Sequence, residues 1–293
     1  MTIRRGDTIG VCMGVKRALE LVEKTRRENP LEPLATIGPL IHNRRVLENL
    51  AGQGVRVIHS PEEVSSGTVI IRAHGLSLEE KQAFLARPVR LLDGTCPRVL
   101  KSQELVSRKG RDGYGVIIVG DARHGEVKAI AGYAGDCRVV DTPESAEALV
   151  LGEKTLVLGQ TTIRQEEYDR ICRILKGKAE ASGGVLEIAQ TICPATRARQ
   201  EALKKLSAGT DALLVIGGRD SANTTGLFHT ARELGKPVWH IEGAGEIPEE
   251  IGRFDRVGLT AGASTPDWII REVEEALASR FGATGEDHGQ TEG

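Results

Sequence analysis

The chain has 293 residues, of which 39 are basic and 41 acidic, and its net charge of −2 excludes bulk electrostatic attraction to nucleic acid or to an anionic membrane. Aromatic residues make up only 3%, so stacking platforms for single-stranded nucleic acid are scarce. No apolar run approaches the roughly 20 residues of a membrane span, and the first residues, MTIRRGDTIG, lack the apolar core of a signal peptide. We therefore expect a cytoplasmic protein whose five cysteines serve metal binding or catalysis before disulfides.

Apolar, β-prone runs alternate with polar loops and helix-like segments along the whole chain. The clearest runs are, in order, TVII (68–71), YGVIIVG (114–120), TLVLG (155–159), ALLVIGG (212–218) and VGLTAG (257–262). Each leads into a loop rich in Gly, His, Ser, Thr or Asn and then into an amphipathic helix. This alternation predicts the α/β class with mostly parallel sheets.

Three cysteines share one local context. Cys12, Cys96 and Cys193 each follow a short apolar, β-prone stretch (DTIGVC, VRLLDGTC and LEIAQTIC) and open a basic, helix-like segment. Pro97 and Pro194 fall at the expected first helical position, which favours proline. A thiol at a helix N-terminus near Lys or Arg is favoured as the thiolate. Three thiolates presented alike predict one shared soft metal or an iron–sulfur cluster.

The number and placement of the cysteines narrow the kind of site. Cys137 and Cys172 lie at the start of a minor strand and inside a helix, so we expect packing roles for both. Structural zinc usually needs a fourth ligand and closely spaced pairs, which the chain lacks. A cluster held by three thiolates leaves one iron open to a substrate oxygen, whereas electron carriers usually use four cysteines. The count therefore favours catalysis.

The polar loops recur with a regular step. The distance from each of the three cysteines to the next polar loop is 30, 28 and 28 residues, and each third then carries a minor strand (VRVIHSPEEV, CRVVDTPESA and VWHIEGAGEIP). This pattern predicts three pseudo-equivalent α/β units, 1–95, 96–190 and 191–282, followed by a disordered polar tail, 283–293. Since ligands bind at the carboxyl ends of parallel strands, we expect the loops and cysteines to surround one central cluster. Ordinary α/β periodicity is the alternative.

The loops between strands and helices carry side chains that suit an anion. Backbone N–H groups at helix N-termini attract anions, and a histidine there adds a charge-assisted bond to phosphate. The candidate cradle for a small phosphorylated molecule consists of His42, His74, His124, Thr161, Thr162, Ser221, Asn223 and Ser264. A helix cap is the alternative role for these residues. The sequence contains neither a Walker loop nor a GxGxxG motif, so nucleotide binding has no direct support.

Glu126 lies two residues after His124, at the expected start of a helix. An acidic residue there often only complements the helix dipole. A desolvated glutamate beside an anion and a metal centre can instead shuttle protons, because burial raises its pKa. The residues alone leave both roles open.

Taken together, these residues make the chain similar to the 4-hydroxy-3-methylbut-2-enyl diphosphate reductase family, also called IspH or LytB. The matching stretches run in order from residue 12 to residue 268: CMGVKRAL, GPLIHNRRVLENL, RAHGLS, DGTCPRV, RHGEV, GQTTI, TICPATRARQEAL, GRDSANT and TAGASTPD. The resemblance implies one 4Fe–4S cluster held by Cys12, Cys96 and Cys193, or a 3Fe–4S form if it is oxidised. It also implies an open iron that takes the allylic hydroxyl of the substrate.

The resemblance further implies the last step of the methylerythritol phosphate route to isoprenoids. Two electrons, delivered singly by a ferredoxin or flavodoxin, and protons would break the C–O bond, releasing water and isopentenyl or dimethylallyl diphosphate. By the same resemblance Glu126 lies on the proton path and Thr161 lies near the substrate hydroxyl. The residues implied to hold or contact the diphosphate are His42, His74, His124, Ser221, Asn223 and Ser264.

Three positions depart from the common pattern of the family. Ala222 stands where many relatives have a second serine, Gly125 replaces a frequent proline, and Pro194 replaces a frequent tyrosine. None of them removes a cysteine or the acid. We expect altered affinity or loop stiffness and not a different reaction.

Two other functions remain open. An iron–sulfur hydro-lyase acting on a small phosphorylated or anionic substrate would also use three cysteines and an acid–base residue, but it needs no external electrons. A non-catalytic redox or metal-sensing module would need neither Glu126 nor the phosphate-type loops.

Overall fold

The computed structural model describes residues 1–285, and the remainder of the predicted tail, 286–293, lies outside the described residues. The chain forms two compact units. Unit 1 comprises Met1–Cys12, His42–Arg44 and the residues from Pro194 onward, and unit 2 comprises Met13–Ile41 and Arg45–Cys193. No helix within residues 1–285 has the length and apolar character needed to cross a membrane.

The strands form three sheets in the described part of the chain, and every strand pair is parallel. Unit 2 contains two of the sheets. The strand order of the first is β3 (Val55–Ile58), β2 (Leu34–Ile37), β4 (Thr68–Ile71) and β5 (Arg90–Asp93). The strand order of the second is β7 (Cys137–Val140), β6 (Gly115–Val119), β8 (Lys154–Gly159) and β9 (Val185–Ala189). Unit 1 contains β11 (Val238–Ile241), β10 (Ala212–Ile216), β12 (Arg256–Ala261), β1 (Thr2–Arg5) and β13 (Thr284–Gly285). The α/β prediction is confirmed.

The three sheets share one strand order. In each, the minor strand lies at the edge, two buried apolar strands follow, and the fourth strand leads toward a cysteine. The sequence repeat therefore corresponds to a repeated topology. One strand departs from the chain order, because β1 pairs with β12, with Ile3 opposite Val257, and so belongs to the sheet of the C-terminal third.

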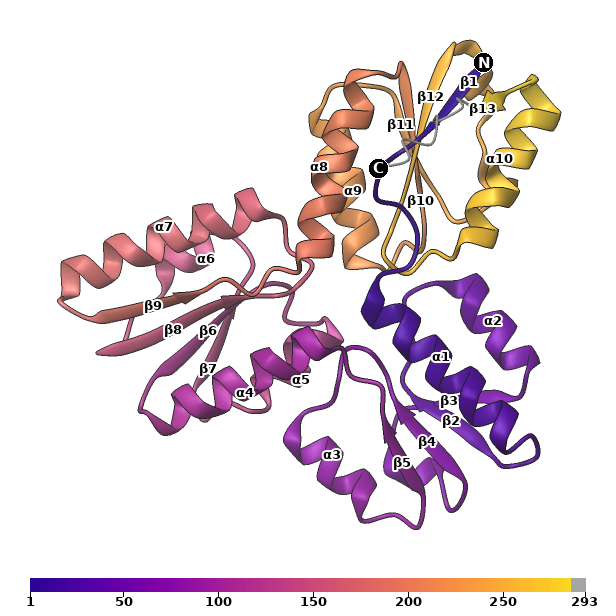
Figure 1. Ribbon diagram of the computed structural model, residues 1–293. Helices are drawn as coiled ribbons and strands as arrows, with labels where there is room; N and C mark the ends of the chain where they lie inside the picture. Colours follow the sequence, from indigo (N-terminus) through magenta and orange to yellow (C-terminus); the bar gives the residue numbers. More distant parts are fainter. Residues whose placement is uncertain (286–293) are drawn as a thin grey trace, which may run out of the picture. The chain divides into compact units, whose positions relative to one another are not determined.

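Ten α-helices connect and cover the strands of residues 1–285. They are α1 (Met13–Glu28), α2 (Arg44–Gly52), α3 (Leu78–Leu85), α4 (Pro97–Arg111), α5 (Gly125–Ala131), α6 (Pro143–Ala148), α7 (Gln165–Ser182), α8 (Pro194–Ala208), α9 (Ala222–Glu233) and α10 (Asp267–Phe281). Within unit 1, α8 and α9 lie on one side of the sheet and α10 on the other (Figure 1). The same figure shows α4 and α5 on one face of the β7-β6-β8-β9 sheet and α6 and α7 on the other.

Side-chain alternation along the strands explains this two-sided cover. On β6, Val116 and Ile118 pack with α4 and α5, whereas Ile117 and Val119 pack with α7. All four side chains are buried, as expected for a strand whose two faces are both covered. Each such side chain contributes about 1.5–3 kcal/mol by leaving water. The sheet thereby gives a rigid base to the loops at its ends.

The strand predicted just before Cys12 is absent. Residues 6–12 form a loop in which Gly6 N–H donates to the carbonyl of Leu259. Gly10 has φ of +88°, a left-handed conformation that an extended strand cannot contain. The tail is ordered at its beginning, because Thr284 and Gly285 pair with β1.

Candidate functional site

The three matched cysteines immediately precede helices α1, α4 and α8. The N–H of Cys96 donates to the carbonyl of Ala73 at 2.9 Å, and that of Cys193 donates to the carbonyl of Thr161 at 2.9 Å. In unit 1, the N–H of Cys12 donates to the carbonyl of Ala263 at 3.0 Å. Each acceptor lies two residues beyond the end of β4, β8 or β12, so each cysteine is held by the same backbone contact.

All five cysteines lie in the described part of the chain, and none of them forms a disulfide. The three matched thiols are half-buried. Burial raises the pKa of both other thiols, Cys137 and Cys172, to about 11, so both stay protonated near neutral pH and are poor ligands and nucleophiles. Cys172 lies on the buried face of α7 and packs in the core, consistent with a packing role.

Glu126 is a buried acid in the first turn of α5, with only 2% of its surface exposed. Its Oε1 accepts the N–H of Thr161 at 2.6 Å, and its Oε2 lies 2.7 Å from the Thr161 hydroxyl oxygen. Desolvation raises the pKa of Glu126, and the two bonds from Thr161 oppose that rise. The acid is therefore biased toward its neutral form and tied to the loop that holds Cys193.

The contact between Glu126 and Thr161 has a counterpart elsewhere in the chain, and the comparison shows which of its atoms are needed to hold the loop. Asn223 lies seven residues after the end of β10, as Glu126 does after β6, and its Oδ1 accepts the N–H of Ala263 at 2.9 Å. Ala263 is the counterpart of Thr161. Holding this loop thus needs only a side-chain oxygen. The acid and the Thr161 hydroxyl that faces it have no counterpart at Asn223 and Ala263.

His124 is the N-cap of α5, and its Nδ1 accepts the N–H of Glu126 at 3.2 Å. This bond places the proton of the neutral imidazole on Nε2, which is then a hydrogen-bond donor. The ring of His74 meets it edge to face, with centroids 4.9 Å apart and planes at 75°. Unit 2 therefore brings two of the predicted histidines together, beside the start of the helix that carries Glu126.

Gln160 is a site-forming residue that the sequence analysis missed. Its side chain is buried. Its Oε1 accepts the N–H of Asp121 at 3.1 Å, and its Nε2 donates to the Thr162 hydroxyl at 2.9 Å. Gly120 makes room for it, since a Cβ there would lie 2.7 Å from this side chain. Gln160 thus fixes both the His124 loop and the Thr162 hydroxyl, and its place in GQTTI was the available signal.

Unit 1 gathers the remaining predicted polar residues. Ser221 is the N-cap of α9 and accepts the N–H of Thr224 at 3.3 Å. The Ser264 hydroxyl donates to the carbonyl of His42 at 3.0 Å and lies 3.4 Å from the Ser221 hydroxyl oxygen. Gly218 allows this approach, because a Cβ there would lie 2.5 Å from the His42 carbonyl oxygen.

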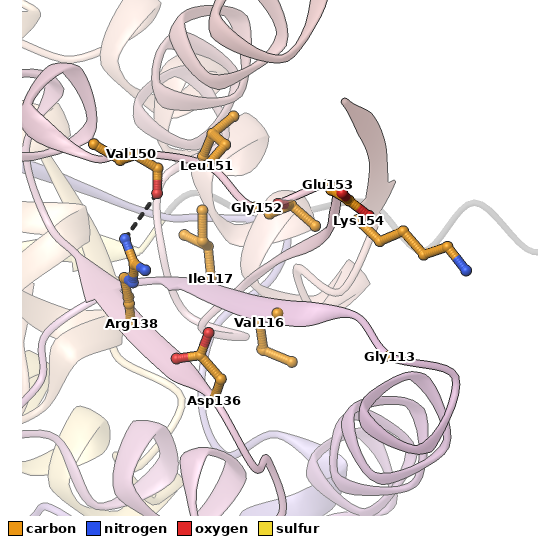
Figure 2. Close-up of a pocket in the computed structure, with 12 residues that line it drawn as sticks. Gly113, Val116, Ile117, Asp136, Arg138, Val150, Leu151, Gly152, Glu153 and Lys154 are labelled. Carbon is orange, nitrogen blue, oxygen red and sulfur yellow. Dashed lines mark hydrogen bonds between the residues drawn. The ribbon is translucent and has the colours of Figure 1, made fainter. Parts of the chain in front are cut away.

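None of these residues lines the cavity of about 460 Å³ in unit 2. It opens at the amino ends of β6, β7 and β8, where Arg138 donates to the carbonyl of Val150 at 2.8 Å (Figure 2). His124, Glu126 and Thr161 lie beyond the carboxyl ends of the same sheet. Because parallel sheets bind ligands at their carboxyl ends, we assign the candidate chemistry there and not to this cavity.

Residues 3–278 match the family model described as LytB protein. The chain belongs to the LytB family. The protein named 4-hydroxy-3-methylbut-2-enyl diphosphate reductase from Treponema denticola is 43% identical over 291 residues, covering 94% of this chain and 99% of that protein. The protein of the same name from Geobacter sulfurreducens is 41% identical and covers 94% of this chain and 97% of its own length.

Two solved structures are similar to this chain. The E-1-hydroxy-2-methyl-but-2-enyl-4-diphosphate reductase from Plasmodium falciparum has a TM-score of 0.90 at 24% identity, covering 97% of this chain and 91% of that chain, which shows the fold. A structure described as (E)-4-hydroxy-3-methyl-but-2-enyl diphosphate reductase, the terminal enzyme of the non-mevalonate pathway, is 36% identical, with a TM-score of 0.69. It covers 95% of this chain and 100% of that chain.

Proposed function

We infer that this chain is a 4-hydroxy-3-methylbut-2-enyl diphosphate reductase, the enzyme of the last step of the methylerythritol phosphate pathway. The observation that carries this inference is the similarity to reductases of that name over 94% of the chain at 41% and 43% identity. In the reaction, the allylic carbon loses its hydroxyl. Two electrons and two protons enter, and isopentenyl or dimethylallyl diphosphate leaves together with water.

The LytB family uses an iron–sulfur cluster, and we propose Cys12, Cys96 and Cys193 as its three ligands in a 4Fe–4S form, or a 3Fe–4S form after oxidation. The donor set fits, because thiolates are the usual ligands of such clusters. The three thiols also share half-burial, a helix start and a backbone N–H already bonded to a neighbouring loop. When bound, the cluster supplies electrons, accepted from a ferredoxin or flavodoxin, and an open iron that polarises the substrate hydroxyl.

We propose that the Glu126 proton is carried on Oε2. Oε1 accepts the N–H of Thr161, and Oε2 accepts the Thr161 hydroxyl when the acid is ionised, so a proton taken up on Oε2 can be shared with that hydroxyl. Oε2 faces the Thr161 hydroxyl oxygen at 2.7 Å. The acid can donate across this contact and free the Thr161 O–H to point toward the leaving oxygen. We propose that this pair delivers the proton that turns the leaving hydroxyl into water.

The polar loops supply donors for the diphosphate. In unit 2 we propose His74 and the Nε2–H of His124. In unit 1, the Asn223 amide keeps its NH₂ group for phosphate, because its oxygen holds the N–H of Ala263. The Ser221 hydroxyl accepts one N–H and keeps its own proton. Ser264 donates to the His42 carbonyl, so we propose that it also holds the loop of His42.

Reconstitution under anaerobic conditions tests the reaction and its proton donor together. With iron and sulfide, the chain should turn brown and consume hydroxymethylbutenyl diphosphate only when a reductant is present. Turnover without external electrons would identify a hydro-lyase instead.

Glu126→Gln should lower kcat about 10²–10⁴-fold with the cluster intact, the usual loss for a general acid. Glu153→Gln, at the far cavity, should keep wild-type turnover, and wild-type kcat in Glu126→Gln would refute the relay.

The cysteine assignment has a control within the same chain. Cys96→Ser should lose iron, sulfide and the visible absorption, since a serine hydroxyl is a poor substitute for a thiolate on iron. Cys137→Ser, which changes a thiol outside the three matched contexts, should retain all three. Equal iron content in both variants would contradict the proposed ligand set.

A further inference from the structure

Arg72 is a half-buried cation in the loop between β4 and His74. Its guanidinium lies against two glycines of unit 2. A Cβ at Gly38 would lie 2.0 Å from Nη1, and a Cβ at Gly125 would lie 2.7 Å from Nη2. The guanidinium therefore occupies the space that a Cβ at either glycine would need. Since Gly125 directly follows His124, the guanidinium lies beside the His124 loop.

The surroundings of this cation are electrostatically unfavourable. Desolvation lowers the pKa of Arg72, and the one acidic group that acts on it is Glu80, whose carboxylate already accepts the N–H and hydroxyl of Ser77. The buried Nε has no hydrogen-bond partner among residues 1–285. The amino end of α5 adds partial positive charge of its own. A buried guanidinium is costly without a counter-charge, so the arrangement favours an anion.

The two glycines that make room have different reasons to be glycine. Gly38 has φ of +67°, a conformation that favours glycine in itself. Gly125 has an ordinary helical backbone and does not need glycine for its conformation. Nη2 of Arg72 fills the space that the missing Cβ leaves, since a Cβ there would lie 2.7 Å from that atom.

We propose that Arg72 binds an oxygen of the substrate diphosphate beside His74 and His124, as a further binding residue of this chain. The proposal rests on the reductase function inferred above. A planar guanidinium suits a diphosphate because it donates two parallel hydrogen bonds to one phosphate group. A bound diphosphate would supply the missing counter-charge and hydrogen-bond acceptors for the guanidinium of Arg72.

Inhibition of the reconstituted holoenzyme by inorganic diphosphate tests the proposal. Arg72→Gln should raise the inhibition constant and KM roughly tenfold or more, the usual loss for a charge-assisted bond to phosphate. The kcat and the iron content should stay near wild type, and Arg72→Lys should recover part of the affinity. Arg138→Gln removes an equal charge at the far cavity and should change neither constant. An unchanged inhibition constant in Arg72→Gln, or an equal rise in Arg138→Gln, would overturn the proposal.

A second variant displaces the guanidinium without removing it. Gly125→Ala introduces a better helix former, and its Cβ would lie 2.7 Å from Nη2 and push the guanidinium aside, so it should also weaken inhibition by diphosphate. In the Arg72→Gln background it should add nothing, because the two changes act on one contact. Equal effects in both backgrounds would refute the role of Arg72. If the wild-type holoenzyme fails to reduce hydroxymethylbutenyl diphosphate, the proposed function fails. If the wild-type holoenzyme turns over normally and Arg72→Gln has an unchanged inhibition constant for diphosphate, only the binding role of Arg72 is refuted.

Discussion

Glu126 shows at the residue scale how burial favours one of two roles that the residues alone left open. A carboxylate in the first turn of a helix is stabilised in its ionised form when it is exposed. Here the side chain is 2% exposed, and desolvation outweighs both bonds from Thr161 and raises the pKa. The role could not be predicted from the residue alone, because the partner Thr161 and the surrounding apolar side chains come from other segments.

The raised pKa predicts a pH dependence of stability. The folded state binds the Glu126 proton more tightly than the unfolded chain, whose ordinary pKa is 4.5. The contribution of this proton to the free energy of unfolding is therefore complete below pH 4.5 and is lost as the pH rises through the higher folded pKa. Urea unfolding of wild type and Glu126→Gln at a series of pH values should show their difference shrinking or reversing as the pH rises. A pH-independent difference would contradict the raised pKa.

Other residues escaped the sequence analysis for the same physical reason. Gln160 and Arg72 lie in the matching stretches GQTTI and RAHGLS, but their roles depend on contacts with residues distant in the chain. Gln160 bonds to the N–H of Asp121, and Arg72 lies against Gly38 and Gly125. The residues predicted successfully as loop residues, such as His124 and Ser221, are local features, since each caps the helix that follows it.

At the scale of elements, the repeated strand–loop–helix unit was predictable because its pattern is local. Each of the five apolar runs and each of the three minor strands contains a strand in the structure. The run before Cys12 does not, because Gly10 adopts a left-handed conformation and its carbonyl accepts a bond from the side chain of Arg199. Backbone conformation at a single glycine was enough to override an apolar pattern.

The repeat also predicts which part of the Asn223 side chain matters for stability. The oxygen holds the N–H of Ala263, whose carbonyl in turn holds the N–H of Cys12. Asn223→Ala should lower the free energy of unfolding by about 1–3 kcal/mol, because a donor loses its acceptor in a protected loop. Asn223→Asp keeps the oxygen, as Glu126 does in unit 2, and should cost much less. Urea unfolding at neutral pH compares the two, and equal losses would show that the bond does not stabilise the loop.

At the scale of the whole chain, the pairing of β1 with β12 could not be read from local patterns. The register of Ile3 with Val257 joins residues from opposite ends of the sequence. Sequence periodicity assigns residues 1–95 to one unit, whereas the structure places Met1–Cys12 with the C-terminal third. A pairing at this separation is set by the open edge of β12 and by burial of Ile3, and both exist only in the folded unit.

Because β1 pairs within the sheet of unit 1, we expect the two units to respond separately when a core side chain is truncated. Ile3→Ala should cost about 2–5 kcal/mol, the usual loss for a buried isoleucine, and should act on unit 1. Amide hydrogen exchange should then lose protection in β10 and β12 while β6 and β8 keep theirs, since exchange reports local unfolding of cooperative units. Ile70→Ala, a matched truncation on β4, should give the reverse pattern, with β4 losing protection and β12 retaining it. Equal loss of protection across all three sheets in both variants would mean that the chain unfolds as one cooperative body.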